Sequence, residues 1–513
     1  MTQQVNDNKR IAYNTVMLYI RMLFLVLISL YTSRIVLQVL GIEDFGLNNV
    51  VGGIISFLGF MTSSLAGASS RFITFALGKG DFNNLKTTFN NIISIHILFA
   101  IIILIIGETL GLWFIQNKLN IPEGREIAAF WVYQFSIITA MGSFICMPFT
   151  AVIIAHEKMS TFAYLTLGDA LLKLLAVYIL TMSPYDKLII YSGMIMLIQL
   201  CDIIIYTIYC YRQFPETHTH KLKIESDIFK EIFIYAGWTM NGNLAVFGYT
   251  QGLNILLNIF FNPIINAARG VAVQVQTVVN NFSYNFQMAI NPQLTKNYAH
   301  GNYKRMHTLI ITSSKFSIYL LYIICLPLSL KAETILNIWL TEVPEHTISF
   351  LRIILMTTIL CALSNPIVTS IHATGKLKKF QIIEGSLLLL IVPISYLTLK
   401  FFNVPPESVF IIHFFIEIIT QYARVKIVLP MINMKLNIYL KKVILPIIKT
   451  ILLGTLIPFI VNQYIGESII SLFCICTISF LSIISAAYIV GCSLDEKKTI
   501  KSKFLQIINR FNP

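Results

Sequence analysis

Apolar runs long enough to cross a lipid bilayer recur along the whole sequence. The hydrocarbon core of a membrane is about 30 Å thick, which a helix of roughly 20 apolar residues can span. A backbone inside that core must satisfy its own hydrogen bonds, as helices do. The sequence therefore predicts an all-α polytopic membrane protein with about fourteen transmembrane helices. The runs lie at roughly 11–35, 46–75, 89–115, 127–155, 160–183, 187–211, 228–260, 264–292, 307–330, 346–372, 377–401, 406–429, 440–463 and 467–491.

The composition excludes a soluble protein. Of the 513 residues, 56% are hydrophobic and 12% are charged, with a mean hydropathy of +0.74. A soluble chain would carry roughly twice this charged fraction. The polar start MTQQVNDNKR leads directly into a full-length span, so we expect the first helix to be a signal anchor. The eight cysteines lack a paired spacing, so neither a disulfide framework nor a metal site is expected.

The net charge of +14 is distributed as membrane topology requires. With the N-terminus inside, cytoplasmic segments hold roughly 25 of the 38 Lys and Arg, and outer loops hold about 6. We interpret the basic runs as topogenic and lipid-facing. Both termini are therefore expected in the cytoplasm, and no nucleic acid is expected as a partner. The basic runs include Lys376, Lys378 and Lys379 in one inner loop and Lys497, Lys498, Lys501 and Lys503 in the tail.

An internal repeat predicts two lobes. The longest inner loop, RQFPETHTHKLKIESD, separates a predicted N-lobe at 1–222 from a C-lobe at 223–430, and 431–513 holds the last two helices and the tail. Six helices in each lobe would make the repeat parallel, related by an axis along the membrane normal. Shifts of 221 and 218 positions align identical residues, among them Val50 with Val271, Gly80 with Gly301, Pro148 with Pro366 and Lys158 with Lys376.

The span at 264–292 carries a polar stripe. At 100° per residue its polar side chains fall within a wedge of about 60°. Polar groups are too costly to face lipid, so the stripe must face other helices or water. Interhelical hydrogen bonding would explain the amides, but the arginine favours a cavity that binds substrate. The stripe consists of Arg269, Gln276, Asn280, Gln287 and Asn291, and a separate polar flank consists of Gln274, Asn281 and Asn285.

Further charges lie inside other spans. Asn14 and Arg21 share a face of the first helix, and Arg71 lies near the inner end of the second. Asp169 and Lys173 have the four-residue spacing of a helical ion pair, which is interpreted as structural or as part of a cavity. The acids Asp202, Glu384 and Glu417 lie toward inner helix ends, where we expect them to snorkel to the surface. The middle of the membrane is thus expected to be more cationic than anionic, which favours a phosphate or diphosphate ligand.

Three segments together resemble the polysaccharide and O-antigen flippases of the multidrug/oligosaccharidyl-lipid/polysaccharide (MOP) exporter superfamily. They are GIEDFGLNNVVGGIISFLGFMTSSLAGASSRFITFALGKGD, AARGVAVQVQTVVNNFSYNFQMAINPQLTKNYAHGN and SIHATGKLKKFQ. The resemblance covers about 1–430 and implies two six-helix lobes that alternate between inward-open and outward-open states. It implies transport of an undecaprenyl-diphosphate-linked oligosaccharide from the cytoplasmic to the periplasmic leaflet, with Arg21 and Arg269 holding the diphosphate.

The predicted function is therefore that of a flippase in a bacterial inner membrane, whose partners are the lipid-linked oligosaccharide and membrane lipids. Other membrane proteins of polysaccharide assembly stay open as partners, and so does coupling to an ion gradient. No cofactor is expected. A multidrug cation exporter of the same fold is the alternative, although it would need carboxylates in the middle of the membrane. A membrane enzyme would need a large outer loop or an embedded acid and base pair, which the sequence lacks, and a purely structural partner in an assembly complex also stays open.

Overall fold

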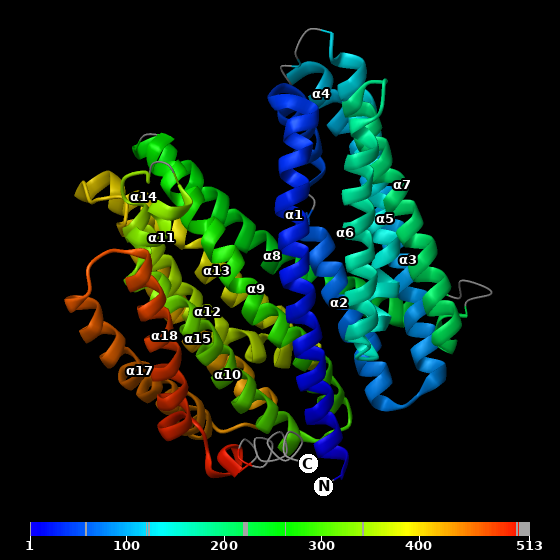
Figure 1. Cartoon of the computed structure of the whole chain (residues 1–513). Coiled ribbons are helices and arrows are strands. Elements are labelled where there is room, and N and C mark those ends of the chain that lie inside the picture. Colours follow the sequence, from blue (N-terminus) through cyan, green and yellow to red (C-terminus); the bar gives the residue numbers. More distant parts are fainter. Residues whose placement is uncertain are drawn as a thin grey trace, which may run out of the picture. The chain divides into compact units, whose positions relative to one another are not determined.

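The computed structural model describes residues 2–56, 59–118, 124–218, 224–261, 263–340 and 343–498, together with residues 121 and 501. The described residues form α-helices and short 3₁₀ and π segments, without a β-strand among them (Figure 1). The predicted all-α class is confirmed.

The helices follow the predicted apolar runs closely. In the first half they are α1 (Thr2–Ser56), α2 (Gly59–Lys79), α3 (Phe82–Ile106), α4 (Leu112–Lys118), α5 (Glu126–Ala155), α6 (Met159–Thr181) and α7 (Lys187–Gln213). In the second half they are α8 (Ser226–Phe260), α9 (Pro263–Ala299), α10 (Tyr303–Leu330), α11 (Ala332–Trp339), α12 (Thr347–Thr374), α13 (Lys378–Leu389), α14 (Ile391–Phe402), α15 (Ser408–Met431), α16 (Leu436–Tyr439), α17 (Leu445–Tyr464) and α18 (Ile469–Ala486).

Ten helical segments in the described part of the chain are long and apolar enough to cross a membrane, as an integral membrane protein requires. The other four predicted spans, 11–35, 46–75, 228–260 and 264–292, also fall on helices, α1, α2, α8 and α9, and the segment Tyr13–Ser29 of α1 is apolar as well. The first of these helices bends, because Gly41 has φ 79° and ψ 172° inside it. Only glycine adopts such angles without strain.

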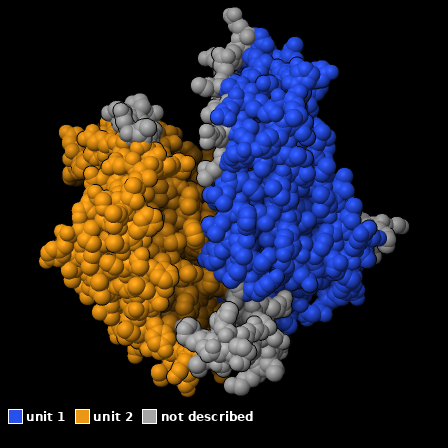
Figure 2. All heavy atoms as spheres, viewed as in Figure 1, with its two compact units in different colours: residues 1–244, 291–302 blue, residues 245–290, 303–513 orange. Residues whose placement is uncertain are grey.

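The chain divides into two compact units, coloured blue and orange in Figure 2. Unit 1 comprises residues 1–244 and 291–302, and unit 2 comprises residues 245–290 and 303–513. Two helices therefore contribute residues to both units: α8 changes unit after Leu244 and α9 after Ile290. Pro292 lies just beyond the second of these points, where it removes a helix hydrogen bond. The predicted lobe boundaries at 222 and 430 stay predictions.

The backbone supports the internal repeat at two pairs of turns. Gly80 and Gly301, 221 positions apart, have φ of 72° and 70°. Glu157 and Gly375, 218 positions apart, have φ of 60° and 75°. This left-handed conformation suits glycine and strains a residue with a Cβ atom. The two halves thus turn in the same way at matching positions, and one of the four positions has a glutamate in place of glycine.

A contact between two helix starts is also repeated between the halves. In unit 1, Arg125 at the start of α5 donates from Nη1 to Asp186 at the start of α7, at 2.5 Å. In unit 2, 221 positions later, Nδ1 of His346 lies 2.5 Å from Glu407. Arg125 also pairs with Asp44. Burial alone would lower the pKa of Arg125, but its bonds to Asp44 and Asp186 outweigh that effect and raise it. Each half therefore fastens the same two helix starts to each other.

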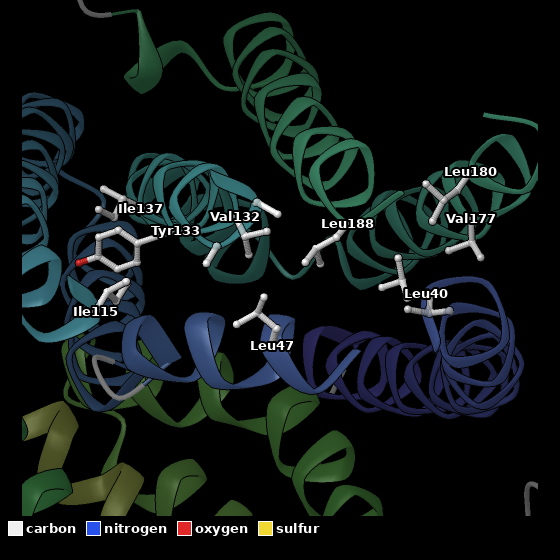
Figure 3. Close-up of a cluster of buried hydrophobic side chains, with 12 residues drawn as sticks. Leu40, Leu47, Ile115, Val132, Tyr133, Ile137, Val177, Leu180 and Leu188 are labelled. Atoms are coloured by element: carbon white, nitrogen blue, oxygen red, sulfur yellow. The ribbon is translucent and has the colours of Figure 1, made fainter. Parts of the chain in front are cut away.

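A hydrophobic core holds unit 1 together (Figure 3). Its side chains come from α1, α4, α5, α6 and α7, and Tyr133, near Ile115 and Ile137 at one end of the cluster, is fully buried. The Tyr133 hydroxyl donates to the Gly107 carbonyl at 2.8 Å, so the buried polar atom is satisfied. The labelled residues of this core are Leu40, Leu47, Ile115, Val132, Tyr133, Ile137, Val177, Leu180 and Leu188.

Two buried lysines of unit 2 fasten the last helical hairpin to α10. Lys331, 0% exposed, donates to the Gly466 carbonyl and to Glu467, each at 3.1 Å, just before α18. Lys315, inside α10, donates to Glu496 at 2.6 Å, just after α18. Burial alone would raise the pKa of Glu467, but hydrogen bonds from Thr334 and Lys331 outweigh it and lower that pKa. The segments on both sides of α18 are thus bound to lysines in or directly after α10.

Candidate functional site

Arg269 on α9 is held inside unit 2. Its side chain is buried, with the residue 8% exposed. Nη1 donates to the Asn254 side chain at 2.9 Å and Nη2 to the Thr250 carbonyl at 3.0 Å, both on α8. The Nε atom is buried without a hydrogen-bond partner. A buried guanidinium with an unsatisfied N–H can donate a further hydrogen bond to an anionic or carbonyl oxygen.

Two amides of the predicted stripe make interhelical hydrogen bonds. Gln276 donates to the Thr358 hydroxyl of α12 at 3.0 Å. Gln287 donates to the Ser317 hydroxyl of α10 and is fully buried. Asn280 is exposed and Asn291 is half-buried. The stripe therefore does not act as one surface: part of it joins helices, and the role of its residues in binding substrate stays a prediction.

The exposed face of α9 is polar. Between Ala268 and Ile290 seven residues are exposed, and Val278 is the single apolar side chain among them. Tyr284 is 61% exposed. Apart from Asn280 and Val278, the exposed residues recur every three or four positions, which places them on one side of a helix. These seven are Gly270, Gln274, Thr277, Val278, Asn280, Asn281 and Tyr284.

A comparison within unit 2 shows what a lipid-facing surface looks like in this protein. Along α17, between Leu445 and Ile460, the exposed side chains are Leu, Ile and Phe, with Lys449 as the exception. Exposed amides in hydrocarbon would cost several kcal/mol each, on the order of the transfer free energies for polar groups. The exposed face of α9 must therefore meet water or a polar ligand.

In unit 1, α1 carries two of the predicted site residues. The Arg21 guanidinium lies 4.5 Å from the centre of the Phe162 ring, which is a cation–π contact. The Asn14 side chain is buried and donates to the Glu157 carbonyl at 3.2 Å. Asn14 therefore joins α1 to the turn between α5 and α6, and a role in binding substrate is a prediction for both residues.

Arg71 on α2 lies among aromatic rings. The guanidinium is 4.2, 4.9 and 5.3 Å from the ring centres of Phe72, Phe75 and Tyr235. Its Nη1 atom is 3.9 Å from Glu231, which is exposed. Aromatic faces attract a weakly hydrated guanidinium. This environment explains how a cation can be buried here, and its predicted contact with substrate stays a prediction.

Asp169 and Lys173 form the predicted ion pair, with 2.8 Å between Nζ and Oδ2. They lie on α6 beside a pocket of about 600 Å³ between α6 and α7, whose lining is mostly apolar and includes five leucines. Asp169 and Asp202 both line this pocket, and Asp202 interacts with both members of the pair. Asp202 is buried, so the expectation that it snorkels to the surface is wrong.

An ionic cluster in unit 2 was missed from the sequence. Arg424 on α15 is buried and donates from Nε to Glu384 of α13 at 2.6 Å and from Nη1 to Glu417. Nη1 also donates to the Ser364 hydroxyl of α12 at 2.8 Å. The expectation that Glu384 and Glu417 snorkel is therefore wrong, because an internal guanidinium holds both carboxylates. The predicted excess of cations is not found in this cluster.

A second group missed from the sequence surrounds Glu157 in unit 1. The carboxylate is 1% exposed and accepts from Gln293 at 2.8 Å and from Lys296 at 2.7 Å. Both donors lie in the last turns of α9. The last turns of α9 are also packed tightly on α2, because a Cβ atom built at Gly78 would lie 2.7 Å from that of Ala299. Glu157 therefore fixes one end of α9 to the turn between α5 and α6.

Among the described residues, no three His, Cys, Asp or Glu side chains gather in a way that could hold a metal ion.

Comparison with known proteins identifies the fold. No protein-family model matches the chain, and no curated protein does. Solved structures match with high confidence. One is an outward-facing multidrug resistance transporter of the MATE family and MOP superfamily, with a TM-score of 0.73 at 12% identity, over 83% of this chain and 96% of that one. Another is the Vibrio cholerae MATE transporter VcmN in its bent form, with a TM-score of 0.69 at 14% identity, over 83% and 98%.

A third match is a MOP superfamily transporter from Pyrococcus furiosus, with a TM-score of 0.71 at 12% identity, over 83% and 96% of the two chains. Its binding pocket is described as having reverse polarity, which suggests a different function for that protein. At these identities the likeness shows the fold. The chain therefore has the fold of MATE and MOP transporters.

Proposed function

We propose that the protein is a transporter that moves a lipid-linked oligosaccharide from the cytoplasmic to the periplasmic leaflet of a bacterial inner membrane. The observation that carries this proposal is the exposed face of α9, which is polar but uncharged from Gly270 to Tyr284. Asparagine and glutamine side chains both donate and accept hydrogen bonds, and exposed aromatic rings stack on apolar faces. Sugar rings offer hydroxyl groups and apolar faces to match both.

The charges of the helix support the same cargo. No Asp or Glu lies between Ala268 and Ile290, whereas Arg269 lies directly beside the polar face. A guanidinium binds phosphate oxygens in pairs. In this proposal Arg269 contacts the diphosphate through its unsatisfied Nε donor, Arg21 assists, and Asn280 contacts sugar. The polyprenyl tail stays in lipid, since a flippase need not enclose it.

Export of cationic drugs is the alternative, because transporters of this fold include multidrug exporters. A drug cation would need an anionic partner, and the carboxylates of unit 2 that are described above are held by Arg424. The pocket beside Asp169 and Asp202 in unit 1 is the feature that favours this alternative. A positive charge added to the exposed face of α9 should favour transport of a diphosphate-linked cargo and hinder transport of a drug cation. The two functions can therefore be told apart.

The test uses the purified full chain in proteoliposomes with a fluorescent polyprenyl-diphosphate oligosaccharide and an impermeant quencher that reports its leaflet. Protein should accelerate exchange between leaflets over empty liposomes. Gln274→Leu and Asn281→Leu should slow it, and Val278→Leu on the same helix is the matched control. Equal exchange with and without protein, combined with uptake of a cationic dye, would contradict the proposal and support the alternative.

A further inference from the structure

The ionic cluster of unit 2 contains an unbalanced charge. Its three charged members are the Arg424 guanidinium and the carboxylates of Glu384 and Glu417. Counted as fully ionised groups, they sum to one negative charge. All three are largely buried, with Glu417 1% exposed. A buried charge without a partner costs several kcal/mol even after the protein relaxes, on the order of the penalties found for buried ion pairs.

The side chains that hydrogen-bond to the cluster do not supply a compensating cation. Ser364 and Gln421 are neutral, and the Gln421 carbonyl oxygen already accepts from the Ser364 hydroxyl at 2.6 Å. The titratable groups that interact with the cluster are Tyr249 on α8, Cys361 on α12 and His413 on α15. The next cation, Arg269 on α9, interacts with Tyr249 and His413, and its Nη1 and Nη2 atoms donate to Asn254 and Thr250 and not to the carboxylates of the cluster.

His413 is poorly placed to carry the missing positive charge. It lies one helical turn from Glu417, but Arg269 and Arg424 also act on it electrostatically. Its ring centre is 5.0 Å from that of Tyr249, and its Nε2 atom is buried without a hydrogen-bond partner. An imidazolium needs an acceptor for each N–H group. The missing acceptor at Nε2 therefore favours neutral imidazole.

We propose that Glu384, Glu417 and Arg424 form a proton-binding site, in which one carboxyl group is protonated and the other is ionised beside Arg424. A proton from water binds one carboxylate oxygen, and the cluster becomes neutral. Two carboxylates that share one site titrate as a pair. This inference is independent of the cargo, since it depends on charges inside unit 2 and not on the exposed face of α9.

Proton occupancy also bears on how the helices of unit 2 are joined. Arg424 links α15 to α13 through Glu384 and to α12 through Ser364. With the proton bound, the guanidinium balances one carboxylate and the second carboxyl group is neutral. After its release, two carboxylates repel each other beside one cation, which weakens the link between α13 and α15.

The test measures the protonated carboxyl group directly. Purified full chain in nanodiscs is titrated from neutral to alkaline pH, and infrared difference spectra record the C=O stretch of carboxylic acids. The wild type should lose such a band as the pH rises. Glu384→Gln and Glu417→Gln should each lose the part of the band that the cluster contributes, since each leaves one carboxylate with one guanidinium. A part that both variants keep comes from other buried carboxyl groups, such as Asp202. Glu231→Gln, at an exposed position, is the matched control and should keep the band.

Arg424→Gln gives the opposite expectation. Without the guanidinium both Glu384 and Glu417 should be protonated, so the part of the band that comes from the cluster should grow about twofold. If this variant does not fold, the two Gln variants still decide the question. The proposal would be overturned if the wild type had no carboxylic acid band at neutral pH. It would also be overturned if both Gln variants had a band as large as that of the wild type. Neither result would bear on the proposed cargo, which the leaflet assay tests separately.

Discussion

The strained turn at Glu157 allows a prediction whose size follows from the structure. The residue has φ 60°, and a residue with a Cβ atom loses about 1 to 2 kcal/mol in this conformation relative to glycine. Its repeat partner, Gly375, avoids that cost. The Glu157 carboxylate accepts two hydrogen bonds, from Gln293 and Lys296. Bonds to a charged group contribute about 1.5 to 3 kcal/mol each, so the two bonds outweigh the strain.

Replacing Glu157 by glycine or alanine separates these effects. Glu157→Gly loses about 3 to 6 kcal/mol of hydrogen bonding and regains about 1 to 2 kcal/mol of strain, a net loss of about 1 to 5 kcal/mol. Glu157→Ala loses the same bonds and keeps the strain, so it should be less stable than the glycine variant by about 1 to 2 kcal/mol. The expected order of stability is wild type, then glycine, then alanine.

The assay is unfolding of the purified protein in mixed micelles with increasing SDS, followed by loss of helical circular dichroism. Lys296→Met provides a double-mutant cycle: it should destabilise the wild type and have little further effect in Glu157→Ala. Gly375→Ala is the matched control, because it adds the strain without removing a carboxylate. A glycine variant as stable as the wild type would refute the role of the carboxylate, and an alanine variant as stable as the glycine variant would refute the strain.

Two further predictions concern the attachment of the last hairpin to α10. Glu467→Gln should weaken the bond to Lys331 at neutral pH. Because the pKa of Glu467 is lowered in the folded protein, the carboxylate stabilises the fold fully above its ordinary pKa of about 4.3, and this stabilisation is lost as the pH falls. The unfolding midpoints of the variant and the wild type should therefore converge in acid. Gly491→Ala should destabilise the hairpin, because the new Cβ atom would lie 2.5 Å from the Tyr319 hydroxyl and 2.7 Å from that of Thr450. Overpacking of this kind costs about 1 to 3 kcal/mol. An unchanged unfolding midpoint would show that both side chains can move away.

The sequence predicted the helices well because hydropathy and span length constrain them strongly. It also predicted the repeat, and the structure adds matching turns and matching side-chain contacts, of residue 125 with 186 and of residue 346 with 407. These features depend on local chemistry: helix starts and tight turns.

The side-chain clusters were harder to predict, because their members are far apart in the sequence. Arg424 meets Glu384 across 40 positions, and Glu157 meets Lys296 across 139. Periodicity predicts the polar faces of α9 but not their neighbours, so the hydrogen bonds of Gln276 and Gln287 to α12 and α10 could not be predicted. One sequence signal was available for Glu157: the repeat aligns it with Gly375, and a glutamate at a position that favours glycine suggests a specific role.

The proposed transport of a lipid-linked oligosaccharide between leaflets can be measured directly in cells that lack this gene. Lipid-linked oligosaccharide would be measured on the two leaflets of the inner membrane, with and without the restored protein. The oligosaccharide should accumulate on the cytoplasmic leaflet, and the restored protein should relieve that accumulation. An unchanged distribution between the leaflets, together with altered sensitivity to cationic dyes, would contradict the proposed transport and support drug export.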